Sequence, residues 1–135
     1  MTVIARLVRP AELAAVKAYC DTARLGEPTL ADLLVVAESD GTYVGLARLS
    51  HERGELILHG LQADDAAAPA LLMQDATRWI AHQGCWAFAQ AVDVALLAEA
   101  GFNDPMAAVP EFLLELKVAR ENAGLALQIL HKAAV

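Results

Sequence analysis

The sequence is poor in several features that mark other classes of protein. It has only two cysteines, Cys20 and Cys85, among 135 residues, which is too few for a small disulfide-stabilised fold. Aromatic residues make up 5% of the chain, whereas 29 alanines and 21 leucines supply most of its apolar surface. The core is therefore expected to consist of many small aliphatic contacts. The high apolar content also excludes a disordered chain.

Long hydrophobic runs are missing as well. Although the mean hydropathy is +0.40, the longest stretch without Asp, Glu, Lys or Arg has 14 residues, from Trp79 to Val92. A membrane-spanning helix needs about 20 mostly apolar residues, and the N-terminus does not show the pattern of a signal peptide. The sequence therefore predicts a cytoplasmic protein with reduced thiols and no membrane partner.

Positive charge is scarce, because 10 Lys and Arg stand against 17 Asp and Glu and give a net charge of −7. Nucleic-acid binding usually requires a basic patch, so no nucleic-acid partner is expected. An acidic surface favours a cationic ligand such as a small amine, although solubility alone would also account for it. No metal site is predicted, because no metal-ligand spacing links the cysteines to His51, His59, His82 and His131.

Hydrophobic periodicity and turn residues predict an alternation of strands and helices. Strands are expected at 3–8, 33–38, 42–49, 55–62, 85–92 and 112–118, and helices at 10–23, 69–83, 94–100 and 119–135. Asp40-Gly41 and the segment Glu52-Arg53-Gly54 are expected to form the turns of an antiparallel meander. The helix between the strands at 55–62 and 85–92 indicates a crossover to a parallel strand.

This order predicts a single α/β (α+β) domain over residues 1–135, with a mixed, mostly antiparallel sheet and helices on both faces. The C-terminal helix, at about 119–135, either covers the sheet or packs against a second copy of the chain in a homodimer.

The order and four local segments resemble the GCN5-related N-acetyltransferase (GNAT) family. The segments are the hairpin at 36–45, the Leu71-Leu72 pair early in a helix that ends at Gly84, the strand that follows, and 96–102 with its Gly-Phe ending. The resemblance covers residues 4 to about 118. It implies the acetyltransferase fold and an acyl-CoA-dependent N-acetyltransferase that acts on a small amine, with acetyl-CoA as the second substrate.

The equivalent of the family's coenzyme A loop departs from the family pattern. The family binds the pyrophosphate on a glycine-rich loop that starts the central helix, where free N–H groups and the helix dipole favour an anion. Residues 64–70 here contain no glycine and no arginine, Pro69 removes one N–H, and Asp64 and Asp65 stand where phosphates would approach. Small side chains still permit a close backbone approach, so the resemblance implies cofactor contacts at Ala66, Ala67, Ala68 and Ala70.

The resemblance also places chemistry on the strand at 55–62. Alternation puts Glu55, His59 and Leu61 on one face. Glu55 and His59 are the implied catalytic bases, and histidine has a suitable pKa. The backbone groups of Leu61 and Gln62 are implied to hold the acetyl group and the pantetheine. The alternative is that Glu55 is a solvated strand end and His59 a buried sheet residue.

The proton-donating tyrosine of many family members is replaced by Leu97, which transfers no proton. Two hypotheses therefore stay open from the sequence. The first is a slow N-acetyltransferase, and the second is a non-catalytic binding or interaction protein that kept the fold and lost the coenzyme A loop.

Overall fold

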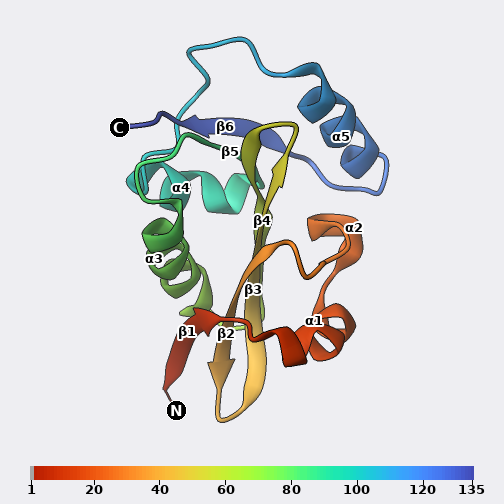
Figure 1. Ribbon diagram of the computed structural model, residues 1–135, viewed down its shortest axis with the longest axis vertical. Coiled ribbons are helices and arrows are strands. Elements are labelled where there is room, and N and C mark those ends of the chain that lie inside the picture. The colour runs from red at the N-terminus through yellow and green to blue at the C-terminus, as the bar shows by residue number, and fades with distance from the viewer. Residues whose placement is uncertain (1) are drawn as a thin grey trace.

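The computed structural model describes residues 2–135 and contains one six-stranded sheet in the order β1-β2-β3-β4-β5-β6 (Figure 1). Neighbouring strands are antiparallel except β4 and β5, which are parallel. This confirms the predicted mixed, mostly antiparallel sheet. The strands are β1 (Val3–Leu7), β2 (Leu33–Ser39), β3 (Thr42–Glu52), β4 (Glu55–Ala63), β5 (Cys85–Ala89) and β6 (Gln128–Lys132).

Helices cover both faces of the sheet, as expected. In Figure 1 α3 (Ala68–Ile80) and α4 (Val94–Glu99) lie on one side, and α1 (Leu13–Tyr19), α2 (Thr22–Leu25) and α5 (Glu111–Glu121) lie on the other. Two 3-10 turns precede α1 and α4, at Pro10–Glu12 and Ala91–Asp93. No helix among residues 2–135 has both the length and the apolar character needed to cross a membrane.

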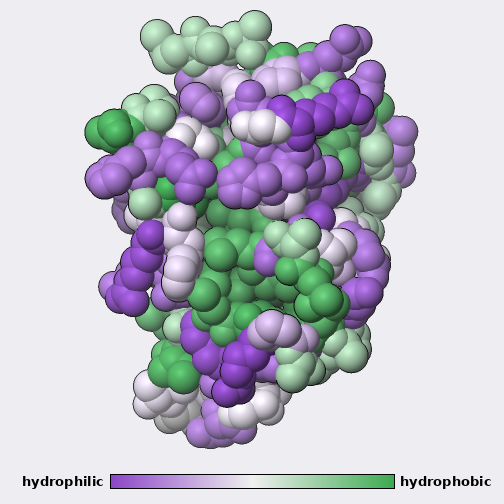
Figure 2. Space-filling model, viewed as in Figure 1, coloured by the Kyte–Doolittle hydropathy of each residue, from purple (hydrophilic) through white to green (hydrophobic). Residues whose placement is uncertain are grey.

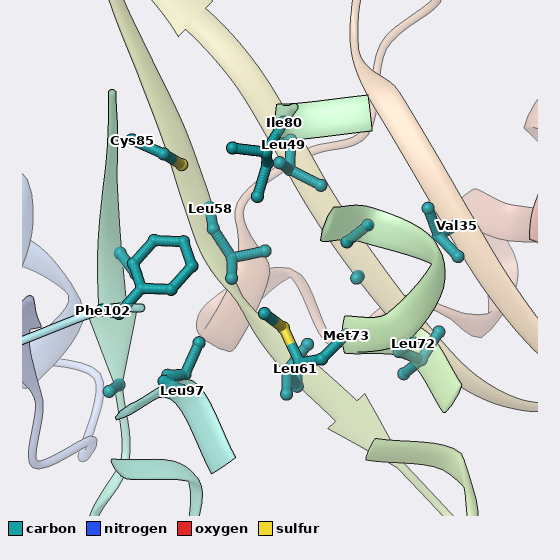
Figure 3. Packing of buried hydrophobic residues seen from close by; sticks show 14 of the residues in the cluster. Val35, Leu49, Leu58, Leu61, Leu72, Met73, Ile80, Cys85, Leu97 and Phe102 are labelled. Carbon is teal, nitrogen blue, oxygen red and sulfur yellow. The ribbon is translucent and has the colours of Figure 1, made fainter. Parts of the chain in front are cut away.

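The larger core lies between the sheet and the α3–α4 layer (Figure 3). Alternate residues of β2, β3 and β4 point into it because side chains of a strand alternate between the two faces. Small and aliphatic residues predominate there, as the composition predicts. Its buried members include Val35, Ala47, Leu49, Leu58, Leu72, Met73, Ala76, Ile80, Leu97 and Phe102. In Figure 2 hydrophobic residues gather in the middle of the face that is shown, and hydrophilic residues surround them.

Two smaller clusters lie on the opposite face. One joins α1 and α2 to β2 and β3 through Val16, Leu25, Leu34, Val36 and Leu46. The other joins α5 to β4, β5 and β6 through Ile57, Trp86, Phe88, Leu113 and Ile129. The sheet is therefore covered on this side by two separate helical units, and their boundary falls near the middle of β4.

Both predicted turns are present, although the second is limited to Arg53 and Gly54 because Glu52 ends β3. Asp40 and Gly41 have φ values of 51° and 78°, and Arg53 and Gly54 have φ values of 52° and 80°. Positive φ at both central residues is the geometry that joins twisted antiparallel strands most tightly. These turns fix the register of the β2-β3-β4 meander.

A bulge interrupts β4 and changes which residues share a face. Arg48 pairs with Gly60 and Leu49 pairs with Leu58, so His59 has no partner in β3. Leu61 consequently packs on the α3 side in the same cluster as Leu58. The prediction that Leu61 shares a face with Glu55 and His59 is therefore wrong, because one extra residue reverses the alternation.

The C-terminal prediction is also wrong. Residues 112–118, expected as a strand, belong to helix α5, and residues 119–135, expected as a helix, contain strand β6. Gly124, with a φ of 98°, lies between the two elements. Ile129 joins the α5-side cluster and Leu130 the α3-side core, so β6 is buried on both faces. Pairing with β5 overrides the helical propensity of this Ala- and Leu-rich segment.

Two other helices differ in extent from the prediction. The helix expected at 10–23 is divided into the turn Pro10–Glu12, α1 and α2, because the chain is extended at Cys20 and Asp21. The central helix α3 ends at Ile80 and not at 83, since Ala81 takes a φ of 50°.

Candidate functional site

The two parallel strands β4 and β5 separate soon after they meet. They pair only at Ile57 with Trp86 and at Leu58 with Ala87, whereas β4 continues to Ala63. Asp64 N–H donates to the Val44 carbonyl at 2.8 Å. Because hydrogen-bonded pairs alternate along an antiparallel ladder, the backbone groups of Leu61 point away from β3 and towards the gap beside β5.

A pocket of about 370 Å³ opens at this gap, which is within the usual range for small-molecule sites. Four segments form it: α2, the end of β4, the loop before α3, and the turn after β5. Its lining residues are Arg24, Leu61, Ala63, Asp64, Asp65, Ala66, Pro69, Gln90, Val92 and Asp93.

Two of the three aspartates in the pocket are held by the protein itself. The Tyr19 hydroxyl donates to Asp64 at 2.6 Å, and burial together with this carboxylate raises the pKa of Tyr19. Asp65 accepts a hydrogen bond of 2.8 Å from the N–H of Ala67.

The other two charged residues of the pocket, Arg24 and Asp93, differ from Asp64 and Asp65 because their side chains have no hydrogen-bond partner in the described part of the chain. Across residues 2–135, no hydrogen bond or ion pair is formed by the side chain of Arg24 or of Asp93. Asp93 is only 8% exposed, and burial raises its carboxyl pKa while the charge of Arg24 acts in the opposite direction.

The start of α3 is already occupied by groups of the chain. The Asp65 carboxylate binds Ala67 N–H, the Asp65 carbonyl accepts from Ala68 N–H at 3.1 Å, and Pro69 has no N–H to offer. The first N–H groups of a helix are the ones that bind anions. Asp65 thus supplies a carboxylate where an external anion would bind.

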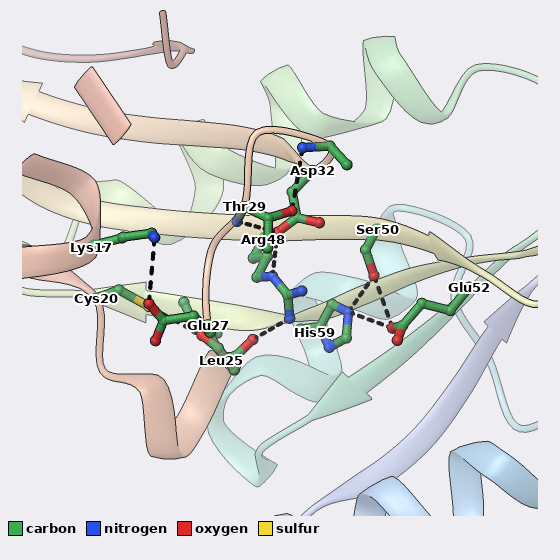
Figure 4. Close-up of polar contacts among 12 residues, drawn as sticks. Lys17, Cys20, Leu25, Glu27, Thr29, Asp32, Arg48, Ser50, Glu52 and His59 are labelled. Carbon is green, nitrogen blue, oxygen red and sulfur yellow. Dashed lines mark hydrogen bonds and ion pairs between the residues drawn. The ribbon is translucent and has the colours of Figure 1, made fainter. Parts of the chain in front are cut away.

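His59 lies at the β4 bulge in a polar cluster, which we call the His59 cluster (Arg48, Ser50, Glu52, His59 and Arg120). Figure 4 shows Arg48, Ser50, Glu52 and His59 of this cluster. Arg120 comes from α5 and donates to His59 Nδ1 at 2.9 Å. Arginine has only donors, so Nδ1 accepts and Nε2 carries the proton. Nε2 then donates to Ser50 Oγ at 2.6 Å, and Ser50 donates to Glu52 at 3.0 Å.

The histidine of this cluster is neutral. It is 2% exposed, and burial, together with the charges of Arg48 and Arg120, lowers its pKa to about 2. Its 3.4 Å contact with Glu52 is therefore not an ion pair at neutral pH. A histidine with this pKa is a poor proton acceptor in that range.

The second predicted base, Glu55, lies at the start of β4 and accepts a hydrogen bond of 3.1 Å from the Trp86 indole. Neither Glu55 nor His59 lines the pocket. Leu97 is 1% exposed and packs in the α3-side core with Phe102, whose N–H donates to the Leu97 carbonyl at 2.9 Å. Residues 2–135 hold no group of three metal-ligating side chains.

No protein-family model and no curated protein matches the sequence. Solved structures, in contrast, match over nearly the whole chain. A GNAT-family acetyltransferase from Streptococcus pneumoniae has a TM-score of 0.63 at 13% identity, with 99% of this chain and 100% of that chain covered. The chain has the GNAT acetyltransferase fold.

Two further matches carry ligand information in their names. An acetyltransferase from Salmonella typhimurium, solved with its cofactor acetyl-CoA, has a TM-score of 0.57 at 15% identity and covers 98% of this chain and 94% of its own. A spermidine N-acetyltransferase chimera from Vibrio cholerae has a TM-score of 0.54 at 11% identity, with coverages of 98% and 96%.

Within the GNAT fold, the predicted cofactor contacts fall into four places. Leu61 and Ala66 line the pocket, while Ala67 and Ala68 form the start of α3. Ala70 lines a neighbouring groove of about 340 Å³ between α3 and α4, together with Met73, Thr77, Leu96 and Ala100. The Gln62 side chain points instead to the α1–α2 connection, where it binds the Tyr19 carbonyl at 2.9 Å and the Asp21 N–H at 2.7 Å.

Sequence reasoning missed Arg24, Gln90 and Val92 as pocket residues, and it treated Asp93 only as a helix N-cap. The α4 helix does begin after Asp93, but the Asp93 side chain makes no capping hydrogen bond. An aspartate between a buried strand and a short helix was the available signal for Asp93. Nothing local distinguishes Arg24, because its place in the pocket depends on how α2 packs against β4.

Proposed function

We propose that the protein binds a small amine in the pocket between β4 and β5 and does not transfer acetyl groups. The observation that carries this proposal is the Asp65 carboxylate on Ala67 N–H at the start of α3. Coenzyme A brings a pyrophosphate to this position in the family that the sequence resembles. Here that position already holds a negative charge.

The loop opposes a pyrophosphate in three ways. Asp65 uses the Ala67 N–H, Pro69 removes another donor, and Asp64 adds a second negative charge nearby. Like charges near a protein surface cost up to about 1 kcal/mol each at low salt. A ligand with two phosphate charges therefore meets repulsion and finds few free donors.

The residues at the predicted proton-transfer positions are also unsuited to acetyl transfer. His59 is buried with its Nδ1 lone pair held by Arg120, and the family resemblance aligns Leu97 with the proton-donating tyrosine of many members. A missing general acid typically lowers the rate by about 10²- to 10⁴-fold. The roles of His59 and Glu55 as bases stay predictions.

The composition of the pocket favours an amine. Its four charged residues are Asp64, Asp65, Asp93 and Arg24, so carboxylates outnumber the single guanidinium. Carboxylates in a cleft attract an ammonium group, and hydrocarbon can pack against Leu61 and Val92. One structural neighbour is named for an amine, spermidine.

The second candidate function is acyl-CoA-dependent N-acetylation of a small amine. The separation of β4 and β5 favours it, because it turns the backbone groups of Leu61 into the pocket. The apolar groove between α3 and α4 adds a second space beside the Ala70 end of the helix. A structural neighbour was solved with acetyl-CoA.

Calorimetric titration separates the two functions. The folded wild-type protein is expected to bind butylamine at millimolar concentration, to give no heat with millimolar acetyl-CoA, and to produce no acetylated amine. Replacing Asp65 by Ala and Pro69 by Gly frees two donors and removes one charge, so this double variant should gain acetyl-CoA binding that weakens with salt. Asp40→Asn is the control, because it removes a carboxylate in an exposed turn that does not line the pocket.

Acetyl-CoA binding by the wild type together with turnover of amines would establish the transferase and overturn the proposal. Absence of amine binding would overturn it as well.

A further inference from the structure

Arg24 and Asp93 are the two charged side chains of the pocket that the protein leaves without partners. We infer that this pair recognises a zwitterion, and that the bound amine is a free α-amino acid. The inference rests on the proposed amine-binding function and identifies its ligand class. Asp93 would accept from the ammonium group, and Arg24 would donate to the carboxylate.

Asp93 is placed unusually for a group without a role in binding. The residue is 8% exposed, lines the pocket, and makes no side-chain hydrogen bond that caps α4. No group among residues 2–135 donates a hydrogen bond to this carboxylate, so a ligand in the pocket can donate to it.

In the part of the chain that the structure describes, the Arg24 side chain lacks a hydrogen-bond acceptor, just as the Asp93 carboxylate lacks a hydrogen-bond donor. Its Nε is buried and has no hydrogen-bond partner among residues 2–135. A guanidinium has only donors, in a planar arrangement that matches a carboxylate. The backbone carbonyl of Arg24 accepts a hydrogen bond from Arg120, so the position of its main chain is fixed from the other side.

The hydrogen-bonding groups that the protein leaves unpaired favour a zwitterion over a simple amine. Asp64 and Asp65 accept hydrogen bonds from Tyr19 and Ala67, so Asp93 and Arg24 are the charged side chains of the pocket without a hydrogen-bond partner among residues 2–135. A simple amine would leave Arg24 unpaired, and a simple carboxylate would leave Asp93 unpaired. An α-amino acid carries both complements on one carbon atom and can satisfy both groups at once.

The experiment measures binding of the twenty common L-amino acids, each at 10 mM, by thermal shift at pH 7.5, followed by calorimetry. At least one is expected to bind. For leucine, whose side chain suits the apolar walls at Leu61 and Val92, the matched ligands are leucinamide, which lacks the carboxylate, and 4-methylpentanoate, which lacks the ammonium. The amino acid that binds should do so at least 10-fold more tightly than either of its matched analogues.

Two conservative variants test whether Asp93 and Arg24 are the residues that bind the amino acid. Asp93→Asn should weaken the zwitterion at least 10-fold and leave the carboxylate-only analogue unchanged. Arg24→Gln should weaken the zwitterion similarly and leave the ammonium-only analogue unchanged. Asp40→Asn and Arg78→Gln remove the same charges at exposed positions outside the pocket and should change nothing.

If none of the twenty amino acids binds, or if both variants bind them as tightly as the wild type, the inference is wrong. If leucinamide and butylamine bind as tightly as any amino acid, the zwitterion is refuted while the amine-binding function stands. If neither amines nor amino acids bind, both fail.

Discussion

Two arginines in this molecule lie close to a buried titratable group, and the two sites differ in how their hydrogen bonds are used. Arg120 donates to His59 Nδ1, to the Arg24 carbonyl at 3.1 Å and to the His59 carbonyl at 3.4 Å. Arg24 and Asp93 have no such partners among residues 2–135. Burial alone does not separate a structural site from a binding site, but the count of satisfied donors and acceptors does.

The difference predicts opposite consequences of mutation. Removing a member of a satisfied buried network leaves its partners unpaired and destabilises the fold. Removing a buried charge that has no hydrogen-bond partner leaves no other group unpaired, and it relieves the desolvation penalty of that charge. The His59 cluster is therefore expected to determine stability, and the Arg24–Asp93 pair is expected to determine ligand binding.

The largest effect is expected from Arg120→Ala. The substitution leaves His59 Nδ1 and two carbonyls without a donor, and it removes a guanidinium that lies 5.5 Å from the centre of the Phe88 ring. We expect a loss of about 3 kcal/mol in the free energy of unfolding, measured by urea denaturation. Arg78→Ala, at an exposed position of α3, should change it by less than about 0.5 kcal/mol. Equal losses in the two variants would show that Arg120 is not a structural anchor.

Gly26→Ala is expected to have the next largest effect. Gly26 has a φ of +75°, and a Cβ there would lie 2.7 Å from both Arg120 Nη2 and Arg48 Nη1. Neither guanidinium can withdraw freely, because Arg48 is held by Asp32 at 2.7 Å and by the Leu25 carbonyl at 2.9 Å. Backbone strain and the clash together should cost about 2 kcal/mol of the free energy of unfolding.

Gly41→Ala is the matched control for that substitution. Its φ of +78° is nearly the same, but no atom lies within 4 Å of the added Cβ. It therefore carries the backbone strain without the clash, and it should cost about 1 kcal/mol. If Gly26→Ala is no worse than Gly41→Ala in the same denaturation experiment, the two guanidinium groups are not packed as tightly as described.

A smaller effect is expected from the titration of His59. Burial lowers the pKa of this residue to about 2 in the folded protein, against about 6.5 in the unfolded chain. Between these values the unfolded state holds a proton that the folded state does not, so the free energy of unfolding falls as the pH falls. From pH 6 to pH 5 the His59 contribution should fall by about 1 kcal/mol.

His59→Gln removes this titration while keeping a hydrogen-bonding side chain. The stability gap between wild type and variant should therefore narrow by about 1 kcal/mol from pH 6 to pH 5. The raised pKa of Asp93 acts with the opposite sign but is present in both proteins, so it cancels. A gap that does not change with pH would mean that His59 becomes protonated in the folded protein.

Much of the sheet was predictable from local signals. Asp40-Gly41 and Arg53-Gly54 specify tight turns, and alternation in the flanking strands fixes β2, β3 and β4. The end of α4 at Gly101 and Phe102 was predictable for the same reason, since the chain closes a local hydrogen bond to Leu97. Each of these features depends on residues that are close in sequence.

The features that could not be predicted depend on distant contacts. Strand β6 is specified by its pairing with β5 and not by its Ala- and Leu-rich composition. The bulge at His59 has no sequence mark that sets it apart, so the face of Leu61 was mispredicted. The polar partners of the site are equally remote, because Arg120 reaches His59 across 61 positions and Tyr19 reaches Asp64 across 45.

The smallest effect, and the one of opposite sign, is expected from Asp93→Asn without ligand. The raised pKa of Asp93 means that ionisation is less favourable in the folded protein than in the unfolded chain. Above the folded pKa this difference lowers stability, and a neutral amide at the same position avoids it. The variant should therefore be more stable than wild type at pH 7.5 in urea denaturation, and the advantage should disappear at acid pH, where the wild-type carboxyl is also neutral. A loss of stability at pH 7.5 would instead show that the carboxylate has a structural partner, and the contrast between the His59 cluster and the Arg24–Asp93 pair would no longer hold.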